Sequence, residues 1–326
     1  MGGSQSTFKG FNLKEDAFDA EEFKKDLDAW LAPMHLQSSR PFLIGWYNQQ
    51  REITADGTQR IEGPDDGVAY AVYSVPGYLD VVIEHFARER PSTGFVDGAT
   101  DAILAQLRQA LPAELEPQVV NTDEGPPYYH VQTIGNVCAE DEHIEAKDIA
   151  NDGDDWEEDL SDRLEETRDP KMWGSESEML RKIFGVNVHP TWGGWYAYRA
   201  LIVLRKGTQA SLQKPEPMAF LATEDKKRIL AEYNLRHQLC VWRDLSDSHP
   251  PEKRYSPEEY FFFTETSPDK RRRFLEMKAS LMTVPISDHA TSPRPSLDGS
   301  FLLMRQCLRP DLRNVGSVAY PVLVWV

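Results

Sequence analysis

The chain has 326 residues, of which 40% are hydrophobic and 27% are charged. This composition is typical of a globular protein with one large domain or two modest ones. The net charge of −17 argues against binding to nucleic acid or anionic membranes, because phosphate contacts require clustered Lys and Arg. Three widely spaced cysteines, Cys138, Cys240 and Cys307, include no CxxC pair. This spacing disfavours a zinc site or a disulfide framework and indicates a reducing compartment.

No apolar run approaches the roughly 20 residues that span a bilayer, and the N-terminus lacks the apolar region of a signal peptide. We therefore expect a cytoplasmic protein. Residues 1–16 predict a flexible leader. Gly2 followed by Ser6 fits the myristoylation pattern, although a plain Gly/Ser leader is the simpler interpretation.

The first part of the chain predicts helices and strands that pair locally. Apolar residues at helical spacing predict a helix over 19–31. Strands are expected at 41–48 and 67–75, joined by a polar hairpin loop. Two helices then follow, near 77–89 and 99–111.

Two more strand pairs flank a very acidic stretch. Segments 117–122 and 128–137 are expected to pair around the turn DEGPP, and 183–204 is expected to form strand, turn and strand. Between them, 140–169 is extremely acidic. A divalent-cation site is one interpretation, but the spacing matches no ligand loop, so a solvated, mobile segment is the better prediction.

The C-terminal third predicts mainly helix. A helix is expected over 223–239, and another starts at Ser256, where Glu259 completes a capping box. Ser267 begins a third helix in the same way.

The elements together predict one domain over 17–285. A tail of uncertain structure follows over 286–326, and its apolar end suits a late edge strand. The whole pattern predicts an α+β fold with a mainly antiparallel sheet flanked by helices.

Several well-known functional motifs are missing. The sequence contains no GxxxxGKS/T, GxGxxG, HExxH or GxSxG, which disfavours P-loop, simple Rossmann, zincin and common hydrolase sites. The stretch DSHPPE at 247–252 approaches the DxHxxG pattern of proteins that offer a histidine to cobalt. Glu252 occupies the glycine position, where a side chain prevents close approach, so we interpret this stretch as a loop.

One turn carries more aromatic surface than a hairpin requires. The stretch HPTWGGWYAYR spans 189–199. Gly193 and Gly194 permit a positive φ or the close approach of a bulky planar group bordered by Trp195. Arg199 enters an apolar strand and should need a carboxylate or phosphate partner. An aromatic-rich hairpin with a structural ion pair is the alternative.

This stretch resembles the signature of the cytosolic cobalamin-processing CblC family, the methylmalonic aciduria and homocystinuria type C family. PFLIGWYN, AYAVYSVPGYLD, YYHVQT and the segment WRDLSDSHPPEKRYSPEEYFFFTETSPDKR resemble the same family. The resemblance runs from about residue 20 to about residue 280. It implies a fold like that of flavin nitroreductases.

The resemblance also implies a function. Members of this family bind cobalamin with its lower base detached from cobalt. They remove the upper ligand by transferring alkyl groups to the glutathione thiolate, or by releasing cyanide after electron transfer from a reduced flavin. FMN or FAD with NADPH would supply the electrons. A cobalamin-trafficking adaptor and methionine synthase are the implied partners, and the protein would be a monomer or a ligand-induced homodimer.

Three arginines match the family's glutathione site: Arg199 in WYAYR, Arg243 in WRD and Arg271 in SPDKR. The run KRRR leaves other registers open for the third. Planar guanidinium groups suit the two carboxylates of glutathione, and their charge favours the thiolate.

The resemblance also assigns cobalamin contacts. These positions are Thr122, Tyr129, His130, Val131, Gln132, His143, Ile144, Glu145, Asn187 and Tyr198. At 143–145 the family has an aromatic run ending in glutamine, whereas this chain is acidic there. No protein ligand to cobalt is expected, and His189, next to Pro190, is more typical of a structural residue.

Two other function classes stay open. A cobalamin-binding chaperone would bind its ligand and hand it over without chemistry, and the acidic 142–145 segment keeps this interpretation open. A general flavin nitroreductase would act without cobalamin, but the sequence has no obvious Arg/Lys cluster for a flavin phosphate.

Overall fold

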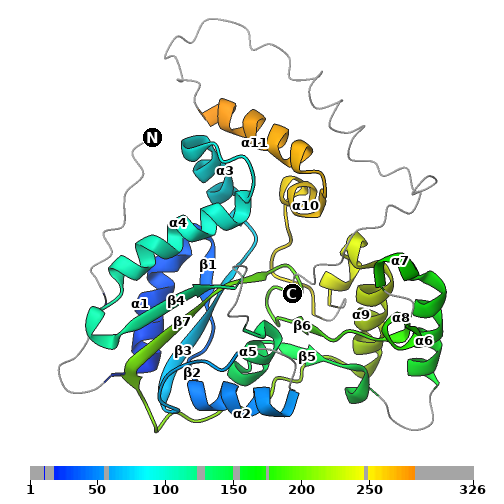
Figure 1. Ribbon diagram of the computed structural model, residues 1–326, viewed down its shortest axis with the longest axis horizontal. Coiled ribbons are helices and arrows are strands. Elements are labelled where there is room, and N and C mark those ends of the chain that lie inside the picture. The colour runs from blue at the N-terminus through cyan, green and yellow to red at the C-terminus, as the bar shows by residue number, and fades with distance from the viewer. Residues whose placement is uncertain are drawn as a thin grey trace, which may run out of the picture.

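A five-stranded antiparallel sheet forms the centre of the protein (Figure 1). The computed structural model describes residues 11, 18–54, 59–122, 129–149, 155–173, 176–245 and 249–282. The strand order is β1-β3-β7-β4, and β2 also pairs with β3. The strands are β1 (Leu36–Ser38), β2 (Phe42–Leu43), β3 (Gly67–Ser74), β4 (Pro117–Asn121) and β7 (Ala197–Thr208).

Helices cover both faces of this sheet. One face packs into a large apolar core with five helices: α1 (Ala20–Leu31), α3 (Tyr78–Glu89), α4 (Phe95–Ala110), α10 (Pro257–Thr264) and α11 (Pro268–Met282). The other face packs against α2 (Ile44–Thr54) and α5 (Val131–Cys138). Alternation along β3 explains the two cores, since Tyr70 belongs to the first and Ala71 to the second.

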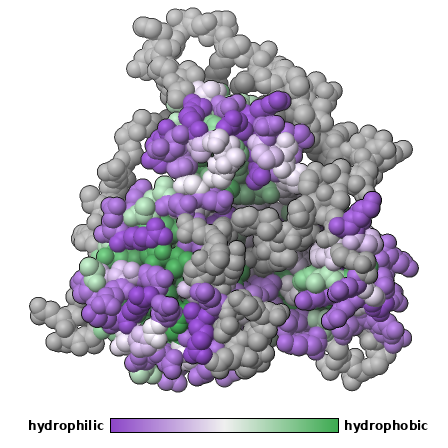
Figure 2. Space-filling model, viewed as in Figure 1, coloured by the Kyte–Doolittle hydropathy of each residue, from purple (hydrophilic) through white to green (hydrophobic). Residues whose placement is uncertain are grey.

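A smaller cluster lies beside the central sheet. Its two-stranded antiparallel sheet consists of β5 (Glu142–Ile144) and β6 (Val186–Val188). The accompanying helices are α6 (Trp156–Thr167), α7 (Pro170–Trp173), α8 (Ser177–Arg181) and α9 (Thr223–Arg236). Figure 2 shows hydrophilic side chains over most of α11 and over the region of α6 to α8.

Short 3-10 helices complete the described structure. They are η1 (Ala32–Met34), η2 (Ala113–Leu115), η3 (Ala146–Asp148), η4 (His237–Leu239) and η5 (Val241–Arg243). None of the helices described combines the length and the apolar character of a bilayer-spanning segment.

Many predicted elements are confirmed. The structure is α+β with an antiparallel sheet and helices, and the helices expected at 19–31, 77–89, 99–111 and 223–239 are present with shifted ends. The capping box of α10 also forms as predicted. The Ser256 side chain accepts from the Glu259 N–H, and the Glu259 carboxylate accepts from the Ser256 N–H.

One predicted strand is mostly helix. The stretch 41–48 is a strand only at Phe42 and Leu43, and α2 begins at Ile44. Helical spacing prevails because the side chains at 44 and 47 both reach the core. Asn48 also exchanges two hydrogen bonds with the backbone of Ile61, which ties the helix to the following loop.

The stretch 128–137 contains α5 rather than a strand. His130 caps this helix by accepting a hydrogen bond from the Thr133 N–H. Ile134, Val137 and Cys138 are buried together, a spacing that a helix places on one face. The prediction followed strand propensity, which is a weak guide for short buried segments.

The acidic stretch 140–169 is not uniformly solvated. It contains β5, η3 and α6, and the prediction is wrong for Asp141 and Glu142, which are buried. Glu142 lies 2.6 Å from the Lys226 ammonium and accepts from two backbone N–H groups at 220–221, so its charge is compensated. The described residues include no group of three His, Cys, Asp or Glu side chains that could hold a metal ion.

Some predictions concern residues outside those described. Most of the leader 1–16 lies there, as do the first two positions of DSHPPE and everything from 283 onward. Myristoylation of Gly2 and the late edge strand therefore stay predictions.

Candidate functional site

The bend at 189–195 connects two sheets. β6 pairs with β5, whereas the next strand, β7, pairs with β3 and β4. The strands on either side of the bend therefore do not pair with each other, as the aromatic-rich hairpin of the alternative interpretation would require. His189 and Gly193 close the bend through two backbone hydrogen bonds of 2.9 and 2.8 Å.

The two glycines make room for another part of this chain. Gly193 has a φ of +59°, and a Cβ there would overlap the Arg243 carbonyl oxygen. A Cβ on Gly194 would overlap the Trp242 ring and Arg243. The Gly194 N–H donates to the Arg243 carbonyl oxygen at 2.9 Å. The close approach expected for a planar ligand is thus occupied by η5, and the bend serves to place Arg243 beside Trp195.

Arg199 is the extra residue of a bulge in β7. In the register with β3, Val72 faces Ala200 and Tyr73 faces Tyr198, so Arg199 has no partner position. A bulge redirects its side chain out of the normal alternation. The Arg199 side chain is 5% exposed and lies between β3 and α3. Its Nε donates to the hydroxyl at position 74 at 3.0 Å, and its guanidinium carbon is 5.3 Å from the ring centre at position 78.

Arg243 lies in an aromatic cage beside the bend. Its guanidinium carbon is 4.6 Å from the Trp242 ring centre and 5.7 Å from those of Trp195 and Tyr255. Nη1 donates to the Gly194 carbonyl oxygen. Nε is buried and has no hydrogen-bond partner among the described residues. The cage therefore holds a guanidinium whose donors are only partly used there.

Arg271 completes the group from the first turn of α11. Its Nε is also buried without a partner in the part of the chain that the structure describes. Arg272 instead donates to the Pro91 carbonyl oxygen at 3.5 Å, and Arg273 is exposed. Among the three registers offered by the KRRR run, Arg271 is the one with a buried, unpartnered guanidinium nitrogen.

Each of two side chains, Asp97 and Tyr255, is affected by the charges of two of these three arginines. Burial raises the pKa of Asp97, and the charges of Arg199 and Arg271 oppose that rise. Burial likewise raises the pKa of Tyr255, and the charges of Arg243 and Arg199 oppose it. We call Arg199, Arg243 and Arg271 the arginine cluster.

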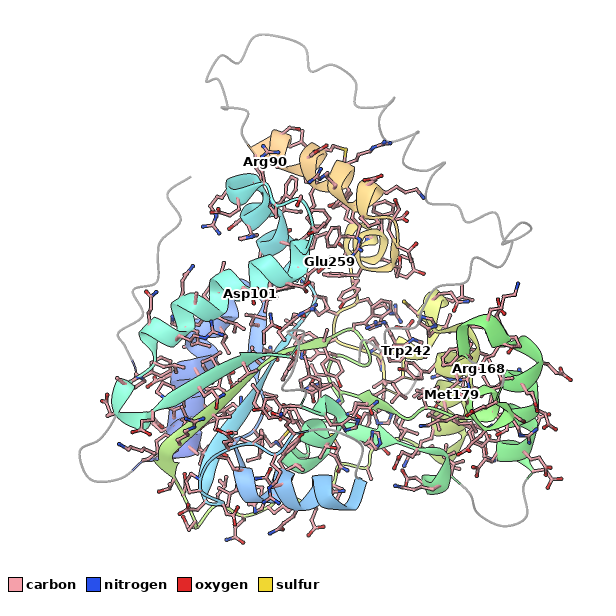
Figure 3. The ribbon with its side chains drawn as sticks, in the orientation of Figure 1. Arg90, Asp101, Arg168, Met179, Trp242 and Glu259 are labelled. Atoms are coloured by element: carbon pink, nitrogen blue, oxygen red, sulfur yellow. The ribbon has the colours of Figure 1, made fainter. Side chains whose placement is uncertain are left out.

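Two further polar residues border the arginine cluster. The Thr122 N–H donates to the Arg199 carbonyl oxygen at 3.0 Å, while the Thr122 hydroxyl is buried without a partner among the described residues. Asp97 is half-buried on the first turn of α4. One turn later Asp101 accepts from Asn121 at 2.7 Å, which fixes this edge of α4 against the end of β4 (Figure 3). Thr122 therefore lies beside Arg199, and its predicted contact with cobalamin stays a prediction.

The remaining predicted cobalamin contacts lie around the start of α5 and the small sheet, and we call this group the second candidate site. His130 is exposed, and five others are half-buried: Tyr129, Val131, Gln132, His143 and Glu145. Three are buried instead, namely Ile144, Asn187 and Tyr198. Hydrogen bonds join members of both groups. Asn187 donates to the Gln132 carbonyl oxygen at 3.3 Å, and its side-chain oxygen lies 2.5 Å from His143 Nδ1.

Asp141 lies at the centre of this second site. It is 2% exposed, and Oδ2 accepts from the Tyr198 hydroxyl and from Asn187 Nδ2 at 3.2 Å. Burial raises its pKa, and His189 and Tyr198 oppose that rise. Sequence reasoning missed Asp141 because one acid in a strongly acidic run carries no separate signal.

His189 uses both ring nitrogens within the chain. Nδ1 accepts from the Thr191 and Trp192 N–H groups at 3.0 and 3.3 Å. Nε2 lies 3.5 Å from both the Glu140 carboxylate and the Tyr73 hydroxyl. This arrangement supports a structural role, because both nitrogens already face partners of this chain.

Comparison with known proteins identifies the family. A profile of the methylmalonic aciduria and homocystinuria type C family matches residues 37–275. The chain belongs to this family. The match includes the whole arginine cluster, Asp141 and the bend between the two sheets.

Curated relatives share most of their length with this chain. A zebrafish (Danio rerio) protein named cyanocobalamin reductase / alkylcobalamin dealkylase is 28% identical over 246 residues, which cover 72% of this chain and 85% of that protein. The human (Homo sapiens) protein of the same name is 25% identical over 286 residues, which cover 85% of this chain and 86% of that protein.

The fold of this family member also matches a solved structure. That structure is a Caenorhabditis elegans B12-trafficking protein, CblC, described as a homologue of the human protein. The TM-score is 0.60 at 21% identity, over 79% of this chain and 96% of the other. This likeness shows the shared fold.

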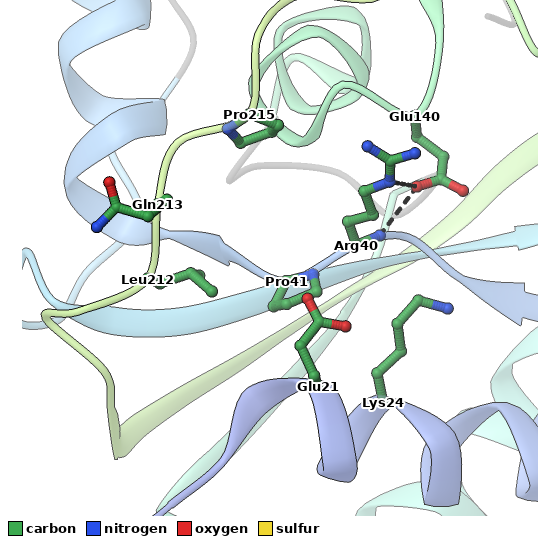
Figure 4. Close-up of a pocket in the computed structure, with 8 residues that line it drawn as sticks. All are labelled: Glu21, Lys24, Arg40, Pro41, Glu140, Leu212, Gln213 and Pro215. Carbon is green, nitrogen blue, oxygen red and sulfur yellow. Dashed lines mark hydrogen bonds and ion pairs between the residues drawn. The ribbon is translucent and has the colours of Figure 1, made fainter.

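A cavity of about 550 Å³, drawn in Figure 4, has no residue of the arginine cluster in its lining. It is lined by Glu21, Lys24, Arg40, Pro41, Glu140, Leu212, Gln213 and Pro215. Both of its cations are already paired, since Lys24 contacts Asp28 and the Arg40 guanidinium lies 3.8 Å from the Glu140 carboxylate. The arginine cluster, in which the terminal nitrogens of Arg243 have a single acceptor among the described residues, is the better candidate for binding an anionic molecule.

Proposed function

We propose that this family member is a cobalamin-processing enzyme that removes the upper axial ligand of cob(III)alamins. Two routes are proposed, which are alkyl transfer to the glutathione thiolate and flavin-assisted reductive decyanation. The observation that carries the proposal is the arginine cluster, in which the terminal nitrogens of Arg243 have one acceptor, the Gly194 carbonyl oxygen, among the described residues. Relatives named for both reactions support it.

The arginine cluster fits the chemistry of glutathione. Glutathione carries two carboxylates, and a guanidinium group binds a carboxylate through two parallel hydrogen bonds. Glutathione also carries one ammonium group. Asp97 is the half-buried carboxylate within electrostatic range of Arg199 and Arg271, so it is proposed to receive that ammonium.

The positive charge of the cluster also suits the chemistry of the thiol. A nearby guanidinium lowers the pKa of a thiol and increases the fraction of thiolate, which is the nucleophile. When the thiolate sulfur attacks the alkyl carbon, the Co–C bond breaks and its electron pair stays on cobalt, which leaves cob(I)alamin. Orientation of the thiolate toward cobalt is the task proposed for the arginines.

The site around Asp141 is proposed to bind the corrin. Its half-buried residues offer both kinds of contact that a corrin requires: Tyr129 and Val131 suit its apolar surface, and polar atoms of Gln132, His143 and Glu145 suit its amides. The lower base would be detached from cobalt, which makes cobalt easier to reduce. A bound flavin, FMN or FAD reduced by NADPH, would supply electrons for decyanation.

The cellular setting is proposed from the same resemblance. The protein would act in the cytoplasm, as a monomer or a ligand-induced homodimer. It would pass its product to a cobalamin-trafficking adaptor and onward to methionine synthase.

An anaerobic spectroscopic experiment tests the proposal. Methylcobalamin is added to the purified protein, a base-off shift is recorded, and glutathione is then added. We expect cob(I)alamin or cob(II)alamin spectra and the formation of S-methylglutathione. A base-off shift without loss of methyl would identify a chaperone instead. Failure to change any cobalamin spectrum, with NADPH turnover of a bound flavin, would favour a general nitroreductase and overturn the proposal.

A further inference from the structure

The hydrogen bonds around Asn187 fix the orientation of its amide. One nitrogen contact is with Asp141 Oδ2 and the other is with the Gln132 carbonyl oxygen; a carboxylate and a carbonyl oxygen both accept. The atom facing them must therefore be the amide nitrogen. The amide oxygen consequently faces His143 Nδ1 at 2.5 Å.

This orientation places a proton on His143 Nδ1. A carbonyl oxygen can only accept, so His143 Nδ1 must be the donor. In the neutral imidazole, Nε2 then keeps its lone pair as an acceptor. Nε2 lies 3.6 Å from Glu145 Oε1, and both side chains are half-buried in the site. The other carboxylate oxygen, Oε2, contacts the Lys147 ammonium, which already supplies Glu145 with a positive charge.

Two acceptors this close together suit a donor with two hydrogens. A primary amide NH₂ group supplies two N–H bonds, one for each acceptor, with only a modest bend in each hydrogen bond. The rim of the corrin ring in cobalamin carries primary amides. A planar aromatic ligand without such amides would leave His143 Nε2 facing Glu145 Oε1 with no donor between them.

We propose that Asp141 is a positioning residue that, through Asn187, holds His143 in its Nδ1–H form so that Nε2 and Glu145 together bind one primary amide of the corrin. The proposal rests on the proposed cobalamin binding for the identity of the ligand. Its claim about the proton on His143 concerns the free protein and stands separately.

Gly135 offers a way to disturb this network without removing a polar group. It lies on α5, and a Cβ there would overlap Asp141 Oδ2, Asn187 Nδ2 and the Tyr198 hydroxyl oxygen. Gly135→Ala also raises helix propensity, which favours α5 itself. Asp141→Asn is the complementary variant, because its amide can present a donor where Tyr198 and Asn187 already donate.

The first measurement uses protein labelled with ¹⁵N at histidine, near pH 7.5 and without ligand. In the wild type we expect the His143 Nδ1 resonance to be that of a protonated nitrogen and the Nε2 resonance to be unprotonated. In Gly135→Ala and Asp141→Asn we expect His143 to be a mixture of its two neutral tautomers, in which the Nε2–H form is common. An Nε2–H or doubly protonated His143 in the folded wild type would overturn the proposal without any variant.

The second measurement compares two corrins by absorbance titration. One is cyanocobalamin and the other is a cyanocorrin with methyl esters in place of all its amides. We expect each variant to bind cyanocobalamin about tenfold more weakly than the wild type, the loss of one or two hydrogen bonds. We expect the ester to bind the wild type and the variants equally.

The outcomes separate this proposal from the proposed function. If the wild type perturbs neither corrin, the proposed function fails, while the histidine spectra still decide the position of the proton. If cyanocobalamin binds the wild type and both folded variants equally, or if the ester discriminates between them as strongly, Asp141 and His143 do not bind an amide and the proposal is wrong.

Discussion

Two arginines, the buried Arg168 and the half-buried Arg243, lie over tryptophan rings in different parts of the molecule and differ in how many acceptors their terminal nitrogens have. Arg168, at the end of α6, lies 4.3 Å from the Trp173 ring centre, and Arg243 lies 4.6 Å from that of Trp242 (Figure 3). Among the described residues, the terminal nitrogens of Arg243 have one acceptor, the Gly194 carbonyl oxygen. Those of Arg168 have four acceptors, which are the carbonyl oxygens of Met179, Leu180 and Lys182 and the side-chain oxygen of Asn234.

The difference matches a structural role for Arg168 and the binding role that is proposed for Arg243. Each keeps a buried Nε without a partner among the described residues, so the terminal nitrogens decide. Backbone carbonyl oxygens of neighbouring segments and Asn234 accept from the terminal nitrogens of Arg168, and these bonds join the end of α6 to α8 and α9. Burial lowers the pKa of Arg168 to about 10. Arg243 is held in place by aromatic rings that leave its fork open, which suits a guanidinium awaiting a carboxylate.

The largest effect is expected from Arg168→Met. Three carbonyl oxygens and Asn234 would lose their donor inside the small cluster, and each buried unsatisfied acceptor costs about 1–3 kcal/mol. Because the site can relax in part, we expect a loss of about 4 kcal/mol in the free energy of unfolding, measured by urea denaturation.

A control on the same helix keeps this test specific. Arg163 is exposed and lies 3.6 Å from Asp159 in a surface pair, so Arg163→Met should change stability by less than about 0.5 kcal/mol. Equal losses for the two variants would contradict the structural role of Arg168.

Arg243→Lys is expected to lower activity with glutathione rather than stability. Lysine keeps the charge and the cation–π contact but loses the planar fork, so the free energy of unfolding should change little. We expect kcat/KM for glutathione to fall about 30-fold, with the dissociation constant for cobalamin unchanged. Arg236→Lys, an exposed change on α9, should alter neither quantity. A parallel loss of cobalamin binding and stability would show that Arg243 supports the fold and would remove the contrast with Arg168.

Asp97→Asn should have a smaller and more selective effect. We expect KM for glutathione to rise about tenfold, the value of one charge-assisted hydrogen bond. A glutathione analogue without the amino group should be used equally by the variant and the wild type. If the variant impaired both thiols alike, Asp97 would act by balancing the charge of the arginines rather than by binding the ammonium.

The family resemblance selected Arg199, Arg243 and Arg271 from the sequence, whereas the space around them was not predictable. Arg199 and Arg243 were identifiable because short motifs surround them, and the α10 capping box follows from residues three apart. What the glycines at 193 and 194 approach was not predictable, because the answer is η5, which lies far along the sequence. The bulge that turns Arg199 also depends on its register with β3, which no local pattern reports.

The burial of charged side chains was also not predictable from the sequence. The acidic run predicted solvent exposure, yet Asp141 and Glu142 are buried because partners arrive from β6, β7 and α9. Likewise, α2 and α5 are rich in residues that favour strands, and the core that selects helix becomes visible only when the sheet is assembled.

The adjacent carboxylates of Glu140 and Asp141 also differ in how fully hydrogen-bond partners compensate their burial. Burial raises the pKa of Glu140, but hydrogen bonds from His189 and the Arg40 N–H outweigh it and leave the pKa below its usual value. Burial dominates at Asp141, whose Oδ1 has no partner among the described residues, and its pKa is raised. A lowered carboxyl pKa stabilises the fold above the unfolded pKa, and this contribution disappears as pH falls, whereas a raised pKa acts in the opposite direction.

The smallest effect is therefore a pair of opposite pH dependences. As pH falls from about 7 to about 4, the stability advantage of the wild type over Glu140→Gln should shrink, whereas the wild type should gain relative to Asp141→Asn. Urea denaturation across this range measures both differences. Slopes of the same sign would mean that Asp141 is as well compensated as Glu140, and the contrast between the two carboxylates would not hold.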